Sequence, residues 1–214
     1  MPCRIVTMGS EQPREDRLRE AAHLIQTGGI VVVPTETFYG LAVDPFNPEA
    51  LAMLISLKGK PDASPIPLLL ANAEQAAQVA GELPEEVAQI TQMFWPGPLT
   101  IVVPAKPDLP EQVTGGTGTV GIRVPGLLLT RRLAETLGRP MTGTSANLHG
   151  GPACRTAAEV VRTFTSRVSM IIDGGPTTGG ASSTVVDFSR PLPRIIREGA
   201  VPASALRPFV PRLS

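Results

Sequence analysis

Short apolar runs and amphipathic segments alternate along most of the chain, and this alternation limits its possible folds more than any other feature. Apolar runs typical of buried strands fall at 30–34, 66–71, 99–105, 120–125, 139–146, 168–175, 183–188 and 194–200. Helical periodicity falls at 14–29, 47–59, 84–95, 127–138 and 156–164. Strands interleaved with helices predict an α/β fold with a twisted mixed sheet flanked by helices.

Residue types at the ends of two predicted helices mark where each begins or stops. Asn47 and Pro48 are a typical N-cap and first-turn pair, and Gly59 is a typical stop for the helix that they open. Gly28 and Gly29 end the helix before it. The glycine-rich stretch at 173–184 is predicted to be a loop.

The length and composition favour one cytoplasmic domain. A chain of 214 residues can bury a full core, so we expect one domain over 1–214, with the motif-bearing part at about 13–200. Only Cys3 and Cys154 are present, too few for a disulfide framework. No apolar run reaches about 18 residues and no signal peptide precedes the first helix, so we expect no membrane segment.

Several common catalytic motifs are absent from the sequence. There is no GxxxxGK[ST], GxSxG or HExxH pattern, which argues against P-loop, triad and zinc hydrolase chemistry. The segment from Gly116 to Gly121 matches GxGxxG, but it precedes a predicted strand instead of opening a helix, so the dinucleotide interpretation fails. The two histidines, His23 and His149, form no metal-binding spacing, and we expect no protein-held metal.

Two cations, Lys58 and Lys60, flank Gly59 at the end of the second helix. One interpretation is that they complement the negative end of the helix. The other is that two cations on a corner stiffened by Pro61 and Pro65 grip a polyanion. The residues alone leave both interpretations open.

Polar side chains gather at the ends of the predicted strands. They are Thr35, Glu36, Thr37, Tyr39, Arg123, Thr144, Ser145, Asn147, Ser182, Ser183, Thr184 and Arg197. Each has an ordinary alternative role, as a cap, a turn residue or a paired core arginine. Together, at the strand ends of an α/β sheet, they are typical of a ligand cleft.

The order of short motifs resembles the YrdC/Sua5 family of threonylcarbamoyl-AMP synthases. The motifs are PTETFYGL, KGKP followed by SPIPLLL, GIRVP, TSAN, STVVDF and IIREGA, and they run from about Ile30 to Ala200. The resemblance implies a single-domain YrdC-like fold. It also implies a nucleotidyltransferase that joins L-threonine, bicarbonate and Mg²⁺-bound ATP into threonylcarbamoyl-AMP. That product would pass to the tRNA threonylcarbamoyl-transfer machinery for the t6A37 modification.

The same resemblance assigns roles to residues of this sequence. The catalytic group is Lys58, Lys60, Ser145 and Asn147, and Lys60 stands where the family usually has arginine. The threonine-binding group is Thr35, Arg123, Ser145 and Ser183. The nucleotide-binding group is Lys58, Lys60, Thr119, Asn147, Arg155 and Arg197.

Two alternative functions stay open at this stage. A carbamoyl-adenylate-forming paralogue would use the same nucleotide grip with carbamoyl phosphate. A double-stranded RNA-binding or ribosome-maturation module would use Lys58, Lys60, Arg123, Arg155 and Arg197 as a basic face. The chain has 19 basic and 19 acidic side chains, so RNA binding is expected to be weak at most.

Overall fold

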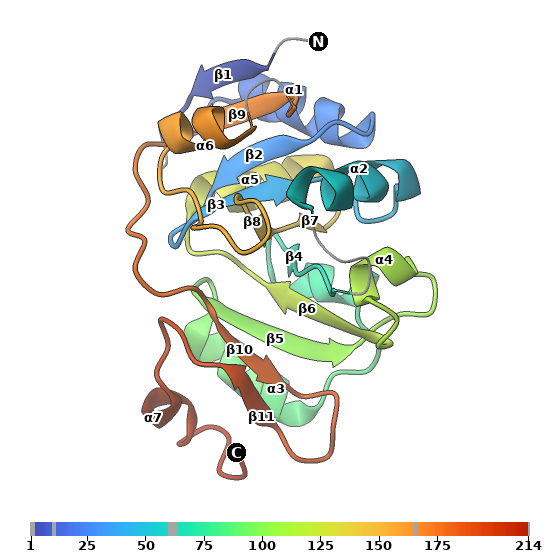
Figure 1. Cartoon of the computed structure of the whole chain (residues 1–214). Helices are drawn as coiled ribbons and strands as arrows, with labels where there is room; N and C mark the ends of the chain where they lie inside the picture. Colours follow the sequence, from blue (N-terminus) through green and yellow to red (C-terminus); the bar gives the residue numbers. More distant parts are fainter. Residues whose placement is uncertain (1–2, 10–11, 60–63, 165–166, 214) are drawn as a thin grey trace.

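The computed structural model describes residues 3–9, 12–59, 64–164 and 167–213, and Figure 1 shows two sheets, one above the other, with helices around them. The helices are α1 (Glu15–Gln26), α2 (Pro48–Lys58), α3 (Glu85–Phe94), α4 (Glu111–Thr114), α5 (Leu128–Leu137), α6 (Ala157–Phe164) and α7 (Ala203–Leu206), with a 3₁₀ helix, η1, at Ala73–Gln78. The strands are β1 (Arg4–Thr7), β2 (Val31–Pro34), β3 (Tyr39–Ala42), β4 (Leu68–Leu69), β5 (Leu99–Pro104), β6 (Thr119–Arg123), β7 (Met141–Thr142), β8 (Thr144–Ser145), β9 (Met170–Asp173), β10 (Thr184–Asp187) and β11 (Arg194–Arg197).

The upper sheet of Figure 1 has the strand order β1-β9-β2-β3-β8 and is covered by helices on both faces. Strand β9 pairs in parallel with β1 and β2, whereas β3 pairs antiparallel with β2 and β8. Val31 and Val33 face a core shared with α1 and α5, and Val32 faces the core shared with α2 and α6. This burial on both sides explains why β2 is an unbroken apolar run.

The lower sheet has the order β11-β10-β5-β6-β4-β7 and is also mixed. One face carries Ile101, Val103 and Ile122, which pack in the same core cluster as Val87 and Ile90 of α3. Successive strand residues point to opposite faces. The second face therefore carries the alternate positions of β5 and β6, and these line cavities.

The mixed α/β class is confirmed, but the strands form two sheets where one was expected. The run 139–146, which we predicted as a single strand, divides at Gly143 into β7 of the lower sheet and β8 of the upper sheet. A Cβ at Gly143 would lie 2.4 Å from Leu69 Cγ, so only glycine fits where the chain crosses between the sheets.

The signals at the helix ends behave as predicted. Asn47 accepts a hydrogen bond from the Ala50 amide, and Gly59 adopts the left-handed conformation after α2. The GxGxxG match leads into β6 and not into a helix, as its predicted context requires. In the described part of the chain, no helix is long and apolar enough to span a bilayer.

Candidate functional site

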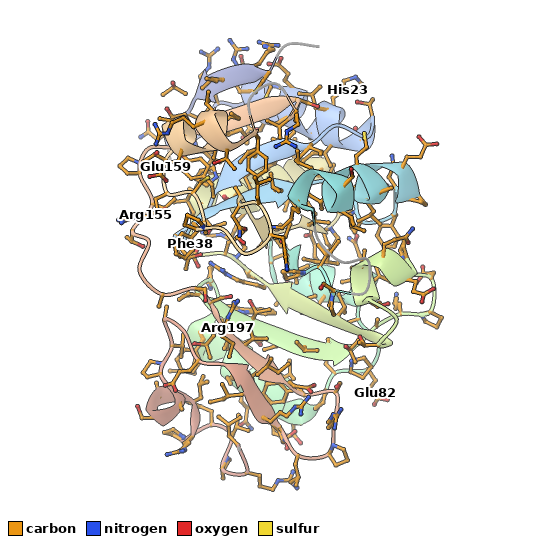
Figure 2. All side chains as sticks on the ribbon, viewed as in Figure 1. His23, Phe38, Glu82, Arg155, Glu159 and Arg197 are labelled. Atoms are coloured by element: carbon orange, nitrogen blue, oxygen red, sulfur yellow. The ribbon has the colours of Figure 1, made fainter. Side chains whose placement is uncertain are left out.

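A cavity of about 310 Å³ lies where the two sheets meet. Its upper wall comes from the β2–β3 connection and β8, and its lower wall from the open face of the lower sheet. The lining residues are Thr35, Thr37, Phe38, Tyr39, Gly40, Pro65, Pro67, Leu69, Thr100, Arg123, Gly143, Thr144, Ser145, Ala153, Ser182, Ser183 and Arg197. In Figure 2, Phe38 is labelled on the upper side of this cavity and Arg197 on the lower side.

The alternation of the lower strands delivers the polar side chains to this cavity. Thr119, Gly121 and Arg123 occupy alternate positions of β6 and share the open face, while Val120 and Ile122 are buried in the core. Thr100 holds the equivalent position on β5 and pairs in register with Val185 of β10. Arg123 and Thr100 thereby line this cavity, whereas Thr119 and Gly121 line a second cavity beside it.

On each wall of the cavity, neighbouring hydroxyl groups are linked to one another by hydrogen bonds. On the upper wall, Thr35 Oγ1 and Thr37 Oγ1 are 3.0 Å apart, and Thr35 Oγ1 also donates to the Phe38 carbonyl. On the lower wall, Thr100 Oγ1 donates to Ser183 Oγ over 3.0 Å. These contacts hold the hydroxyls in fixed positions beside the cavity, as a selective polar site requires.

Two arginines give the lower wall a positive charge. Arg123 is 6% exposed, and Arg197 donates from Nε and Nη2 to the Ser183 carbonyl. Burial, and then the nearby Arg123 guanidinium, lower the pKa of Arg197 from its ordinary value. Two cations close enough to repel each other favour an anionic ligand between or beside them.

Lys58 and Asn147 meet next to this cavity. Lys58 Nζ donates to the Ser145 carbonyl over 2.5 Å and to Asn147 Oδ1 over 3.0 Å. Ser145 Oγ also donates to Asn147 Oδ1, over 2.6 Å. Lys58, Ser145 and Asn147, which the resemblance placed in one catalytic group, are therefore brought together. Of the three, Ser145 also lines the cavity.

The other predicted nucleotide residues have different positions. Thr119 and Arg197 line a second cavity of about 600 Å³, which shares Thr100 and Ser183 with the first. Arg155 lies outside the lining of both cavities and donates to the Thr178 carbonyl. Figure 2 labels it beside the long segment between β9 and β10. Lys60 lies outside the described residues.

Sequence reasoning missed Thr100, and it named Tyr39 among the polar residues at the strand ends but gave it no role. Thr100 and Tyr39 both line the cavity, and Tyr39 donates to the Gly175 carbonyl over 2.8 Å. Burial, and then the nearby Asp173, raise the pKa of Tyr39. Periodicity along β5 would have selected Thr100, whereas the contact that places the Tyr39 hydroxyl is with Gly175, 136 residues away, and no local pattern marks it.

A protein-held metal is not indicated in the part of the chain described. Among residues 3–9, 12–59, 64–164 and 167–213, no group of three or more His, Cys, Asp or Glu lies close enough to hold an ion. The donor set of the cavity consists of hydroxyls, carbonyls and guanidinium groups, which suit an organic anion better than a bare divalent cation.

A mixed α/β fold with a hydroxyl- and arginine-lined cavity between two sheets defines a small-molecule-binding protein of the α/β class. Comparison with known proteins makes this specific. The family model for Sua5, YciO and YrdC, described as "Telomere recombination", matches residues 23–199. The chain belongs to this family.

Individual relatives agree with that assignment. A threonylcarbamoyl-AMP synthase of Pyrococcus abyssi is 36% identical over 94% of this chain, which spans 59% of that protein's length. One from Halorhodospira halophila is 37% identical over 87% of the chain and 92% of its own length. The structure of P. abyssi Sua5 complexed with L-threonine superposes with a TM-score of 0.93 at 34% identity, covering 98% of this chain and 62% of that one.

Proposed function

We propose that the protein is an L-threonylcarbamoyladenylate synthase. One observation carries the proposal: Thr35, Arg123, Ser145 and Ser183, which the family resemblance assigns to threonine, all line the same cavity of about 310 Å³. That volume lies at the small end of ligand pockets and suits an amino acid. The name of the Halorhodospira relative and the threonine complex of P. abyssi Sua5 support the same reaction.

Arg123 is suited to bind the threonine carboxylate. Its Nε donates to the Gly97 carbonyl and one Nη2 hydrogen to Glu36 Oε1. Since a guanidinium has five N–H groups, three remain for a ligand, including both on Nη1. A pair of parallel N–H donors binds a carboxylate bidentately. The hydroxyls of Thr35 and Ser183 would then contact the amino acid from opposite walls.

The chemistry needs no protein nucleophile. The threonine amine attacks bicarbonate, a C–N bond forms and water leaves, which gives a carbamate. The carbamate oxygen then attacks the α-phosphorus of ATP, the bond to the bridging oxygen breaks, and pyrophosphate leaves. We propose that Lys58, Asn147, Thr119, Arg155 and Arg197 hold the nucleotide through this step.

Positioning and charge stabilisation would supply the rate enhancement. Lys58 is 5% exposed and is held by two oxygens at the edge of the cavity. A fixed ammonium there would stabilise negative charge that develops on the phosphates. We propose that Mg²⁺ enters bound to ATP, with the phosphates as its main ligands, and that it neutralises part of their charge.

The cellular setting follows from the reaction. We propose that the protein acts in the cytoplasm, where ATP and tRNA occur, and passes threonylcarbamoyl-AMP to tRNA threonylcarbamoyl-transfer enzymes. A mixed anhydride of this kind hydrolyses readily in water, so transfer to an acceptor protein would conserve the product.

The test is pyrophosphate release from ATP and Mg²⁺, with and without bicarbonate, comparing L-threonine with L-serine and with no amino acid. Release that requires both bicarbonate and threonine supports the proposal. Release that requires carbamoyl phosphate instead would replace it with carbamoyl-adenylate formation. If no condition gives release, and double-stranded RNA binds with steep salt dependence, the RNA-binding alternative would replace it.

A further inference from the structure

Glu36 lies next to the cavity without lining it. Its neighbours Thr35 and Thr37 both line the cavity, whereas Glu36 is absent from the lining set. The lining continues through Phe38, Tyr39 and Gly40, so Glu36 is the one residue from 35 to 40 that stays outside it. Any effect of Glu36 on a ligand in this cavity therefore passes through a neighbouring residue.

That other residue is Arg123. Glu36 Oε1 accepts a hydrogen bond from Arg123 Nη2 over 2.5 Å, and the Arg123 side chain is only 8% exposed. The Gly97 carbonyl accepts from Arg123 Nε over 3.1 Å. Two acceptors on two different nitrogens fix the plane of the guanidinium, which a single contact would not do.

The surroundings of Glu36 hold its carboxylate in place. A Cβ at Gly126 would lie 3.2 Å from Glu36 Cδ, so the backbone there packs directly against the carboxylate. The Thr178 hydroxyl donates to the Glu36 carbonyl oxygen, which anchors the backbone. These contacts come from parts of the chain well separated in sequence, and they converge on one acid.

The second carboxylate oxygen, Oε2, is buried and has no hydrogen-bond partner among the described residues. Buried polar atoms in folded proteins nearly always have partners, so an exception calls for a functional reason. The other oxygen, Oε1, is paired, and its partner is Arg123, so the contact of this carboxylate with the site runs through that arginine.

We propose that Glu36 is a positioning residue that orients Arg123, so that the remaining N–H donors face the carboxylate of the bound amino acid. The identity of that ligand rests on the proposed function. The role of Glu36 in orienting Arg123 does not depend on that function. Without Glu36, the guanidinium can turn toward the vacated space and lose its aligned pair of donors.

The decisive variants are Glu36→Ala, which removes the acceptor, and Glu36→Gln, which keeps an acceptor oxygen of the same reach. Glu82→Gln is the matched control, because Glu82 is exposed and is labelled in Figure 2 far from the cavity. The melting temperature should fall in Glu36→Ala, because Arg123 loses its buried partner, and should change little in Glu82→Gln. The KM for ATP reports on general damage to the site and is expected to change little in all three variants.

Kinetics give the first readout. In Glu36→Ala, we expect the KM for L-threonine to rise about 10- to 100-fold, because a hydrogen bond to a charged group is worth a factor of this size. Glu36→Gln should recover most of the loss. The preference for L-threonine over L-threonine amide should fall in Glu36→Ala, because only the carboxylate contact is weakened. An unchanged or lower KM for threonine would overturn the proposal.

Nuclear magnetic resonance gives a readout that needs no substrate. In ¹⁵N-labelled protein, the Nη2–H signal of Arg123, identified by its loss in Arg123→Lys, should be rigid in the parent protein and in Glu36→Gln, because Nη2 is the nitrogen that donates to residue 36. It should become mobile in Glu36→Ala. A rigid signal in Glu36→Ala would overturn the proposal. A parent protein without threonine-dependent turnover would overturn the proposed function alone, and this signal would still decide the role of Glu36.

Discussion

Lys58 Nζ donates a hydrogen bond to Asn147 Oδ1 over 3.0 Å, although 89 residues separate the two in sequence. The contact forms because the end of α2 and the loop after β8 meet beside the cavity. The His149 amide also donates to the Lys58 carbonyl, over 2.8 Å, so both the side chain and the backbone of Lys58 are tied to this loop. In the proposed reaction, a cation held in this way would meet the phosphate oxygens of ATP without first having to be ordered.

Lys58→Met should lower kcat for threonylcarbamoyl-AMP formation by about 100-fold or more, the effect of removing one donor that stabilises transition-state charge. Methionine keeps the length of the buried side chain, so the fold should persist. The measurement is the initial rate of threonine-dependent pyrophosphate release, together with a thermal melt.

Lys106→Met is the matched control for that variant. Lys106 lines neither of the two cavities, so turnover should stay close to that of the parent protein. Equal activity in Lys58→Met and Lys106→Met would remove Lys58 from the reaction.

Lys58 and Asn147 should act as one unit. We expect Asn147→Ala to lower kcat/KM, and the double variant with Lys58→Met to lose less than the sum of the two single losses. The coupling should be about 0.5–3 kcal/mol, the range for residues in direct contact. The measurement is a double-mutant cycle on kcat/KM, and strictly additive losses would show that the contact has no part in catalysis.

The sequence predicted the strands and helices that have strong periodicity, and it did less well where tertiary contacts decide. Helices α1, α2, α3, α5 and α6 all fall within their predicted ranges. Strand β3 was missed because a tight connection after Pro34 returns the chain at once, with no apolar alternation to mark it. The division into two sheets was missed because it depends on Gly143 meeting Leu69, a contact that no local pattern encodes.

The site residues show the same contrast between what local sequence indicates and what tertiary contacts decide. Thr35, Arg123, Ser145 and Ser183 stood among the polar residues at strand ends, the family resemblance assigned them to threonine, and all four line one cavity. Glu36 stood in the same polar cluster as Thr35 but was given no role, although it lies between two lining residues. Its role depends on a partner 87 residues away, and the sequence alone gives no sign of that pairing.

Gly143→Ala should destabilise the protein by about 1–3 kcal/mol, the usual cost of adding a methylene to a packed site. The new Cβ would lie within 3 Å of three carbon atoms of Leu69, which is itself 3% exposed and has little room to move. The measurement is the unfolding free energy from denaturant titration.

Gly81→Ala provides the comparison for that variant. A Cβ there would meet only Pro104 atoms, at 3.7 Å and 3.8 Å, which is ordinary contact. Its effect should stay within about 1 kcal/mol. Equal destabilisation by the two substitutions would show that the crossing at Gly143 has room to spare.

Asp187→Asn should make stability less dependent on pH. The Asp187 side chain is 5% exposed; burial acts to raise its pKa, but hydrogen bonds from Ser189 and Arg194 outweigh burial and lower the pKa below the ordinary value of 3.8. A carboxyl whose pKa is lowered on folding stabilises the protein above its unfolded pKa, and this contribution is lost as pH falls through the folded pKa. The variant should therefore be about 1–3 kcal/mol less stable at pH 7.

The difference between Asp187→Asn and the parent protein should shrink as the pH falls below 3.8, because the parent then loses the same charge. Denaturant midpoints measured from pH 7 down to about pH 3 would check this. Asp108→Asn is the control, since Asp108 is exposed and its substitution should have little effect at any pH. A stability gap that stays constant across this range would mean that Asp187 contributes through its shape and neutral hydrogen bonds, and not through its charge.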